Sequence, residues 1–210
     1  MTDLMEHGLL IDPFMGTNEL KVQWVERENW TYRTQVRNRT MGTPSVLRFE
    51  GLDTYARISI NDSLALETDN AHRAYEVALP VQAPSWTIEV TFLSPVAAGQ
   101  ARLDALPRLI PVSNEMKPQG QQTSSVTRKP GYQYGWDWGP RLTSAGFTGP
   151  VYIERIRQPM RSQNRITTEF NSEGDAIVTC QREGAWPPGD WVLRDPNGFR
   201  IAQVDSTSEV

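Results

Sequence analysis

Large apolar and polar residues alternate with a period of two along much of the first 156 residues. The clearest alternating runs are residues 30–36, 46–49, 55–60, 74–79, 86–92 and 151–156. Because successive side chains of a β-strand point to opposite faces, each run predicts a strand with one buried face. Strands separated by short polar turns are typical of an antiparallel β-sandwich, and no long helical period competes with this interpretation.

Two segments depart from the alternation. The first 25 residues predict irregular chain with short helices near residues 3–7 and 18–25. Residues 97–131 combine four prolines with the polar run Gln-Gly-Gln-Gln-Thr-Ser-Ser at 119–125, and they predict a long connection without regular structure. A connection of this length inside a compact domain is as a rule functional or disordered.

The pattern also predicts a domain boundary near residue 156. Residues 157–162 have the composition of a linker, and strands resume at 166–170, 176–180, 191–194 and 199–204, before a polar end at 205–210. The 54 residues from 157 to 210 are about half of the roughly 100 that an immunoglobulin-like sandwich takes. The chain is therefore predicted to be all-β, with a sandwich domain at 1–156 and part of a second at 157–210.

Composition and charge exclude several classes of protein. The net charge is −4 and the 21 basic residues are scattered, so we expect no nucleic-acid partner, because phosphate binding needs a concentrated basic face. No apolar stretch reaches the roughly 18 residues of a membrane span, and we expect no membrane partner. The first residues lack the basic and apolar regions of a signal peptide, so we expect none there. The compartment stays open, cytoplasmic if Met1 is the true start and periplasmic or secreted if earlier residues are missing.

Cysteine and histidine are too scarce for most metal or triad chemistry. One cysteine and two histidines exclude an internal disulfide and a cysteine-based zinc site, and we expect neither metal nor cofactor. Aromatic residues are abundant instead, with seven Trp, six Tyr and six Phe. Any candidate chemistry is therefore sought among the aromatic side chains.

Residues 128–141 concentrate these aromatics, with Tyr132, Tyr134, Trp136 and Trp138 at every second position. An extended segment would place all four on one face, although the nearby glycines and proline favour a bent segment. One interpretation is a core strand whose aromatics fill the sandwich. The other is a carbohydrate site, in which a Trp face packs on sugar C–H groups and Asp137 accepts hydrogen bonds from hydroxyls.

The run Gly-Trp-Asp-Trp-Gly-Pro at 135–140, preceded by Arg-Lys-Pro at 128–130, resembles the signature of β-mannosidases of glycoside hydrolase family 2. Further similar blocks follow the family's order: Asp-Pro-Phe at 12–14, Asn-Glu-Leu at 18–20, Trp-Thr-Tyr at 30–32, and Phe-Glu-Gly-Leu-Asp at 49–53. The resemblance covers nearly all of residues 1–156. It implies a sugar-binding, galactose-binding-like jelly-roll β-sandwich that lacks its first strand, followed by a partial immunoglobulin-like β-sandwich.

The resemblance also implies a reaction that this chain cannot complete by itself. Members of the family are retaining enzymes that release terminal β-linked mannose, with two Glu residues about 5–5.5 Å apart on a (β/α)8 barrel. Such a barrel takes about 250 residues, more than the 210 of this chain. We therefore assign no catalytic residue and expect this chain alone to be inactive. The implied partners are a β-mannoside substrate and the catalytic barrel of the same full-length protein.

Candidate binding residues come from the same resemblance. Asp137 is expected to hold hydroxyls of the terminal mannose, and Trp136 to form a wall of that subsite. Trp138 is expected to pack. Arg128 is expected either to orient the loop or pair with Asp137, or to be a solvated charge. Glu26, like other scattered acidic residues, is expected to be a solvated charge.

Two alternatives stay open from the sequence. One is a stand-alone carbohydrate-binding module without catalytic activity. The other is a non-catalytic adhesion or scaffold sandwich whose aromatics are all core, and it predicts that Asp137 is buried or packed away from any groove.

Overall fold

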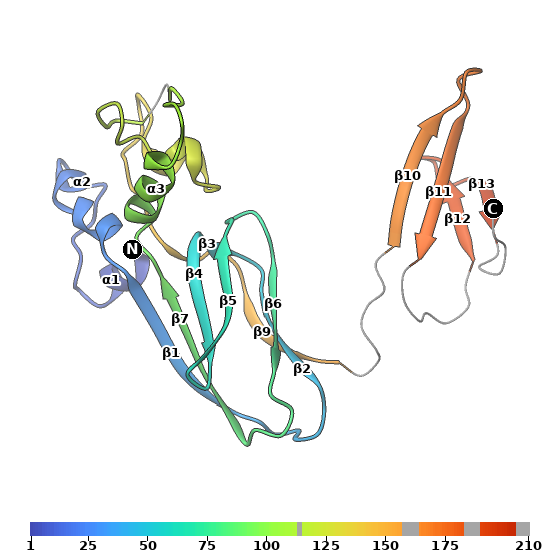
Figure 1. Cartoon of the computed structure of the whole chain (residues 1–210), viewed down its shortest axis with the longest axis horizontal. Coiled ribbons are helices and arrows are strands. Elements are labelled where there is room, and N and C mark those ends of the chain that lie inside the picture. Colours follow the sequence, from blue (N-terminus) through green and yellow to red (C-terminus); the bar gives the residue numbers. More distant parts are fainter. Residues whose placement is uncertain (113–114, 157–163, 183–189, 205–210) are drawn as a thin grey trace. The chain divides into compact units, whose positions relative to one another are not determined.

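The computed structural model describes residues 1–112, 115–156, 164–182 and 190–204 (Figure 1). The chain forms two units, Met1–Arg155 and Ile156–Val210, which are described separately. Strands dominate the described residues, and this confirms the all-β fold class. The predicted linker at 157–162 and the polar end at 205–210 lie outside the described residues.

Two antiparallel sheets form the body of the first unit (Figure 1). The four-stranded sheet has the order β1-β7-β4-β5, and the three-stranded sheet has the order β6-β2-β9. A short pair, β3 with β8, accompanies them. The bounds are β1 Trp30–Arg37, β2 Ser45–Phe49, β3 Leu52–Asp53, β4 Tyr55–Ile60, β5 Ser63–Asp69, β6 Tyr75–Leu79, β7 Ser85–Phe92, β8 Gly146–Phe147 and β9 Val151–Arg155.

The core lies between these two sheets. Along β7 every second residue is buried, from Trp86 to Phe92, as the alternation predicted. These side chains join buried residues of the opposite sheet, including Leu47 and Phe49 of β2 and Leu79 of β6, in one apolar cluster. Each large apolar side chain buried in this way stabilises the fold by about 1.5–3 kcal/mol. The predicted two-layer β-sandwich is therefore the observed architecture.

Strand β5 was not predicted from the alternation of apolar and polar residues, because most of its side chains are exposed. It lies at the edge of the four-stranded sheet, and Leu64 is 59% exposed. A two-residue turn connects it to β4, and both turn residues, Asn61 and Asp62, have positive φ angles of 50° and 63°. That conformation is the one that tight hairpins use, and Asn and Asp tolerate it well. An edge strand that buries little carries only a weak alternation.

Helix α3, Pro95–Asp104, occupies the start of the connection that was predicted to lack regular structure. The Ser94 hydroxyl accepts a hydrogen bond from the backbone N–H of Ala97 at 3.0 Å, and Pro95 follows at the first turn, where proline suits a helix. The buried face consists of Pro95, Gly99 and Leu103. Two of these three residues are not markedly apolar, so the helical period is nearly invisible in the sequence.

The other helices of the first unit are short. They are α1 Thr2–Glu6, α2 Asn18–Lys21 and the 3₁₀ helices η1 Gln23–Arg27, η2 Ser124–Val126 and η3 Gly131–Tyr134. Short helices near both predicted N-terminal positions are thus present. None of the helices among the described residues has the length and apolar character needed to cross a membrane.

The described residues of the second unit form two antiparallel strand pairs. Strands β10, Asn164–Phe170, and β11, Ala176–Arg182, form one pair, and β12, Trp191–Arg194, and β13, Arg200–Val204, form the other. The turn between β12 and β13 is closed by a hydrogen bond from the Gly198 N–H to the Asp195 carbonyl at 3.0 Å. The immunoglobulin-like identity of residues 157–210 stays a prediction.

Candidate functional site

The Trp-Asp-Trp segment is a tight loop and not an extended strand. Helix η3 ends at Tyr134, and the next residue, Gly135, turns the chain sharply with a φ of 95°. The N–H groups of Trp136 and Gly139 then donate to each other's carbonyls, at 3.1 and 3.3 Å. The bent segment predicted from the glycines is confirmed, and the single aromatic face of an extended segment is wrong.

The loop divides its aromatic residues between the core and the solvent. Tyr134 is 1% exposed, whereas Tyr132, Trp136 and Trp138 are 75%, 44% and 84% exposed. Burial raises the pKa of the Tyr134 hydroxyl to about 12, and the neighbouring hydroxyls of Thr127 and Thr123 offset part of that rise. Trp138 was expected to pack, but it is the most exposed of the four. The scaffold alternative, with all aromatics in the core, is therefore wrong.

Asp137 lies at the tip of this loop and is exposed. Within the described residues its carboxylate forms no hydrogen bond and no ion pair. Arg128 is also exposed, and its carbonyl accepts a hydrogen bond from the Ala71 N–H at 2.9 Å. No pair between Arg128 and Asp137 is formed. The loop thus presents a free carboxylate between two exposed indoles.

A buried ion pair holds the two arms of the loop together at its base. The Lys129 ammonium lies 2.5 Å from Asp53 Oδ2 and donates to the Ser144 carbonyl at 2.6 Å. Gln133 Nε2 donates to the same Asp53 oxygen at 2.7 Å, and the Leu142 N–H donates to the Gln133 carbonyl at 3.0 Å. Burial lowers the pKa of Lys129, and the Asp53 carboxylate opposes that shift.

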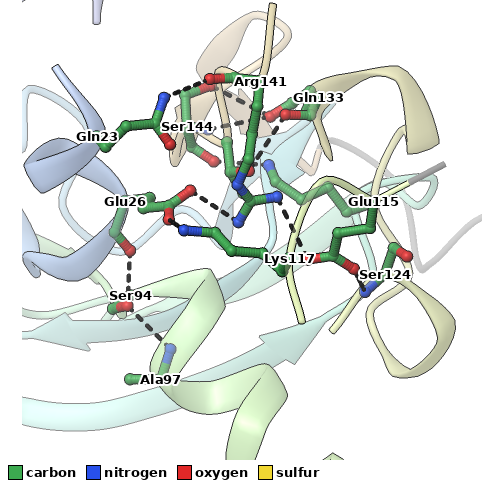
Figure 2. A network of polar contacts seen from close by, with 12 residues as sticks. Gln23, Glu26, Ser94, Ala97, Glu115, Lys117, Ser124, Gln133, Arg141 and Ser144 are labelled. Atoms are coloured by element: carbon green, nitrogen blue, oxygen red, sulfur yellow. Dashed lines mark hydrogen bonds and ion pairs between the residues drawn. The ribbon is translucent and has the colours of Figure 1, made fainter. Parts of the chain in front are cut away.

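A second buried network anchors the C-terminal arm of the loop (Figure 2). Arg141 Nη2 lies 2.9 Å from Glu26 Oε2, and Arg141 Nη1 donates to Glu115 Oε1 at 3.3 Å. Lys117 Nζ lies 3.5 Å from Glu26 Oε1. Glu26 is only 2% exposed, so its predicted role as a solvated charge is wrong. Burial of Glu26 is possible because two cations neutralise it, as buried charges require.

The sequence pattern indicates the loop but not the two networks beneath it. Asp53, Glu115 and Arg141 carry no local signal, because each is paired with a residue far away along the chain. Only the pairing of their buried charges marks these residues, and that pairing can be recognised only once the folded structure is known. The described residues contain no cluster of three or more His, Cys, Asp or Glu side chains placed to hold a metal ion.

This geometry suits binding better than catalysis. An ionised carboxylate accepts hydrogen bonds from hydroxyl groups, and an indole face packs against apolar C–H groups. A retaining glycosidase needs two carboxyl groups about 5–5.5 Å apart, whereas Asp137 stands alone at the tip. The loop can therefore offer a hydrogen-bond acceptor for hydroxyl groups and apolar surfaces for C–H groups.

Comparison with known proteins agrees with this description. β-Mannosidase B of Thermothelomyces thermophilus is 38% identical over 157 residues, which cover 72% of this chain and 18% of the relative. β-Mannosidase B of Aspergillus niger is 33% identical over 157 residues, which again cover 72% of this chain and 18% of the relative. This chain therefore spans less than a fifth of the length of these curated relatives.

Solved structures give the same relationship. The match to the β-D-mannosidase of Dictyoglomus thermophilum covers 97% of this chain and 25% of that enzyme's chain, with a TM-score of 0.71 and 29% sequence identity. The β-D-glucuronidase of the same organism shares only the fold, with a TM-score of 0.51 and 17% identity. Residues 1–149 match the family described as the glycosyl hydrolase 2 galactose-binding domain-like family. This chain belongs to that family.

Proposed function

We propose that this chain is the N-terminal part of a retaining, exo-acting β-mannosidase, which hydrolyses terminal non-reducing β-D-mannose residues. In this proposal the chain supplies the Trp136–Trp138 loop to the substrate pocket and is inactive without the catalytic barrel. The observation that carries it is the unpaired, exposed Asp137 carboxylate, held between two exposed indoles on a braced loop. Similarity to proteins named β-mannosidase supports it.

The proposed role of each loop residue follows from its chemistry. Asp137 accepts hydrogen bonds from two neighbouring hydroxyls of the terminal mannose, and such charge-assisted bonds are about twice as strong as neutral ones. Trp136, which is partly covered, forms one wall of the subsite. Trp138 is more exposed and packs against the catalytic barrel or the substrate. Arg128 orients the chain that enters the loop.

Selectivity follows from the same carboxylate. A site built to hydrogen-bond a hydroxyl rejects an analogue that lacks or misplaces it, because the buried acceptor is then left without a partner. Asp137 therefore favours sugars with the hydroxyl arrangement of mannose. The nucleophile and the acid/base, two Glu residues in the resemblance described above, are expected in the catalytic barrel.

The test is Asp137→Ala in the complete protein, with kcat/KM measured on an aryl β-mannoside. Loss of two hydrogen bonds to a charged group, each worth about 1.5–3 kcal/mol, predicts a decrease of roughly 10²–10⁴-fold in kcat/KM. Asp104→Ala is the matched control, since Asp104 is an exposed aspartate at the end of α3. A near-wild-type kcat/KM for Asp137→Ala would contradict the proposed loop function.

The stand-alone carbohydrate-binding module makes a different prediction. It predicts that the complete protein does not hydrolyse β-mannosides and that the 210-residue chain binds manno-oligosaccharides by itself, through Asp137. Hydrolysis assays on the complete protein and calorimetric titration of the chain separate the two. Hydrolysis that depends on Asp137 supports the enzyme, and binding without hydrolysis supports the module.

A further inference from the structure

We infer that Arg141 is a positioning residue, which holds the Asp137 carboxylate in place through a buried charge network with Glu26 and Glu115. The inference rests on the proposed function of the loop. Arg141 is 6% exposed, so its guanidinium does not reach a sugar bound at the exposed tip. Any effect of this side chain on substrate binding must therefore pass through the loop itself.

Arg141 closes the loop at its neck. The opposite side of the neck is Gly135, where a Cβ atom would lie 3.3 Å from Arg141 Cβ, and the φ of Gly135 is +95°. The guanidinium carbon of Arg141 lies 5.4 Å from the centre of the buried Tyr134 ring. Movement of the Arg141 side chain therefore moves the neck, and with it the tip that carries Asp137.

The guanidinium ties the neck to two other parts of the chain (Figure 2). One side faces Glu26 of η1 at 2.9 Å, and the other donates to Glu115 at 3.3 Å. Glu115 is itself fixed, since its second oxygen accepts a hydrogen bond from the Ser124 N–H at 2.9 Å. The planar fork of arginine can engage two carboxylates at once, which the point charge of lysine does poorly.

The backbone of Arg141 is held as firmly as its side chain. Its carbonyl accepts a hydrogen bond from Gln23 Nε2 at 2.7 Å, and the same amide nitrogen donates to the Glu19 carbonyl at 2.9 Å. Two carboxylates, one guanidinium and the Lys117 ammonium balance in charge within the network. The ion pairs of this network leave no net charge to be neutralised by a ligand, which suits a role in fixing the loop before substrate arrives.

The test is a double-mutant cycle between Arg141 and Asp137 in the complete protein. Misplacement of a binding group by about 1 Å can cost 10²-fold, so Arg141→Lys should lower kcat/KM on an aryl β-mannoside by roughly 10–100-fold. In the Asp137→Ala background the same change should cost less than about 2-fold, because the group that Arg141 positions is already absent.

Arg48→Lys is the matched control. Arg48 also bridges two glutamates, Glu76 at 2.7 Å and Glu154 at 2.6 Å, but it does so across the strands β6, β2 and β9. This variant should leave kcat/KM unchanged. An equal effect of Arg141→Lys with and without Asp137, or no effect in either background, overturns the inference. If Asp137→Ala alone has no effect, the proposed function fails instead.

Hydrogen exchange provides a readout that does not depend on the proposed function. In the 210-residue chain, Glu115→Gln keeps the shape of the side chain but removes one charge from the network. The amides of Trp136 and Gly139, which are bonded to each other's carbonyls, should then exchange at least several-fold faster than in the wild-type chain. Unchanged exchange at these two amides overturns the inference, even if Arg141→Lys does not fold.

Discussion

Replacement of Lys129 with methionine removes the ammonium group that neutralises the buried Asp53 carboxylate. The side chains of Lys129 and Asp53 are 0% and 2% exposed, and Nζ lies 2.5 Å from Oδ2. Removal of one partner of a buried ion pair costs about 3–5 kcal/mol, because the remaining charge stays buried without compensation. Gln133 still donates to Asp53, so we expect a loss near 3 kcal/mol, within that range.

Urea unfolding of the 210-residue chain, followed by circular dichroism, measures this loss. The double variant Asp53→Asn/Lys129→Met should recover much of it, since no uncompensated charge remains. Arg57→Met is the matched control, because the Arg57–Glu67 pair is 57% exposed on both sides and should contribute under about 1 kcal/mol. The reasoning is refuted if Lys129→Met costs no more than Arg57→Met, or if the double variant is as unstable as the single one.

Three further predictions concern the first unit. The pKa of Tyr134 is raised to about 12, so its contribution to the free energy of unfolding is present below pH 10 and is lost as pH rises toward 12. Urea unfolding between pH 10 and pH 12 should therefore show that Tyr134→Phe loses about 2–3 kcal/mol less free energy of unfolding than the wild-type chain. Gly99→Ala should lower the free energy of unfolding by about 1–3 kcal/mol, since its Cβ would lie 2.8 Å from Thr123 Cβ; an unchanged urea midpoint would oppose this. Phe92→Ala should lower the free energy of unfolding by about 3–5 kcal/mol, because Phe92 is 0% exposed, whereas Trp138→Ala should lower it by under about 0.5 kcal/mol, because Trp138 is 84% exposed. Similar losses for the two variants in thermal unfolding would contradict the burial assigned to the two residues.

Much of the sandwich could be predicted because its strands bury one face. In β7 the buried residues alternate with partly exposed ones without interruption, and the sequence pattern follows that burial directly. Strand β5 and helix α3 were missed for a shared physical reason. The first is an edge strand that buries little, and the second buries a face made partly of proline and glycine. Neither element leaves a hydrophobic period in the sequence.

The candidate loop was partly predictable. Its aromatic density and glycines indicated a bent segment around Asp137, and the structure confirms the bend. Which aromatics are buried could not be predicted, because burial of Tyr134 and exposure of Trp138 depend on segments distant in the sequence. The same holds for the charges beneath the loop. Glu26 resembles any solvated glutamate until Arg141 and Lys117 are brought beside it.

The most direct test of the central claim is a crystal structure of the complete protein with a mannose-configured inhibitor. The account predicts that the Asp137 carboxylate lies about 2.5–2.7 Å from hydroxyl oxygens of the terminal sugar, with Trp136 against the same sugar. A sugar bound with Asp137 in solvent, or a loop turned away from the pocket, would contradict it.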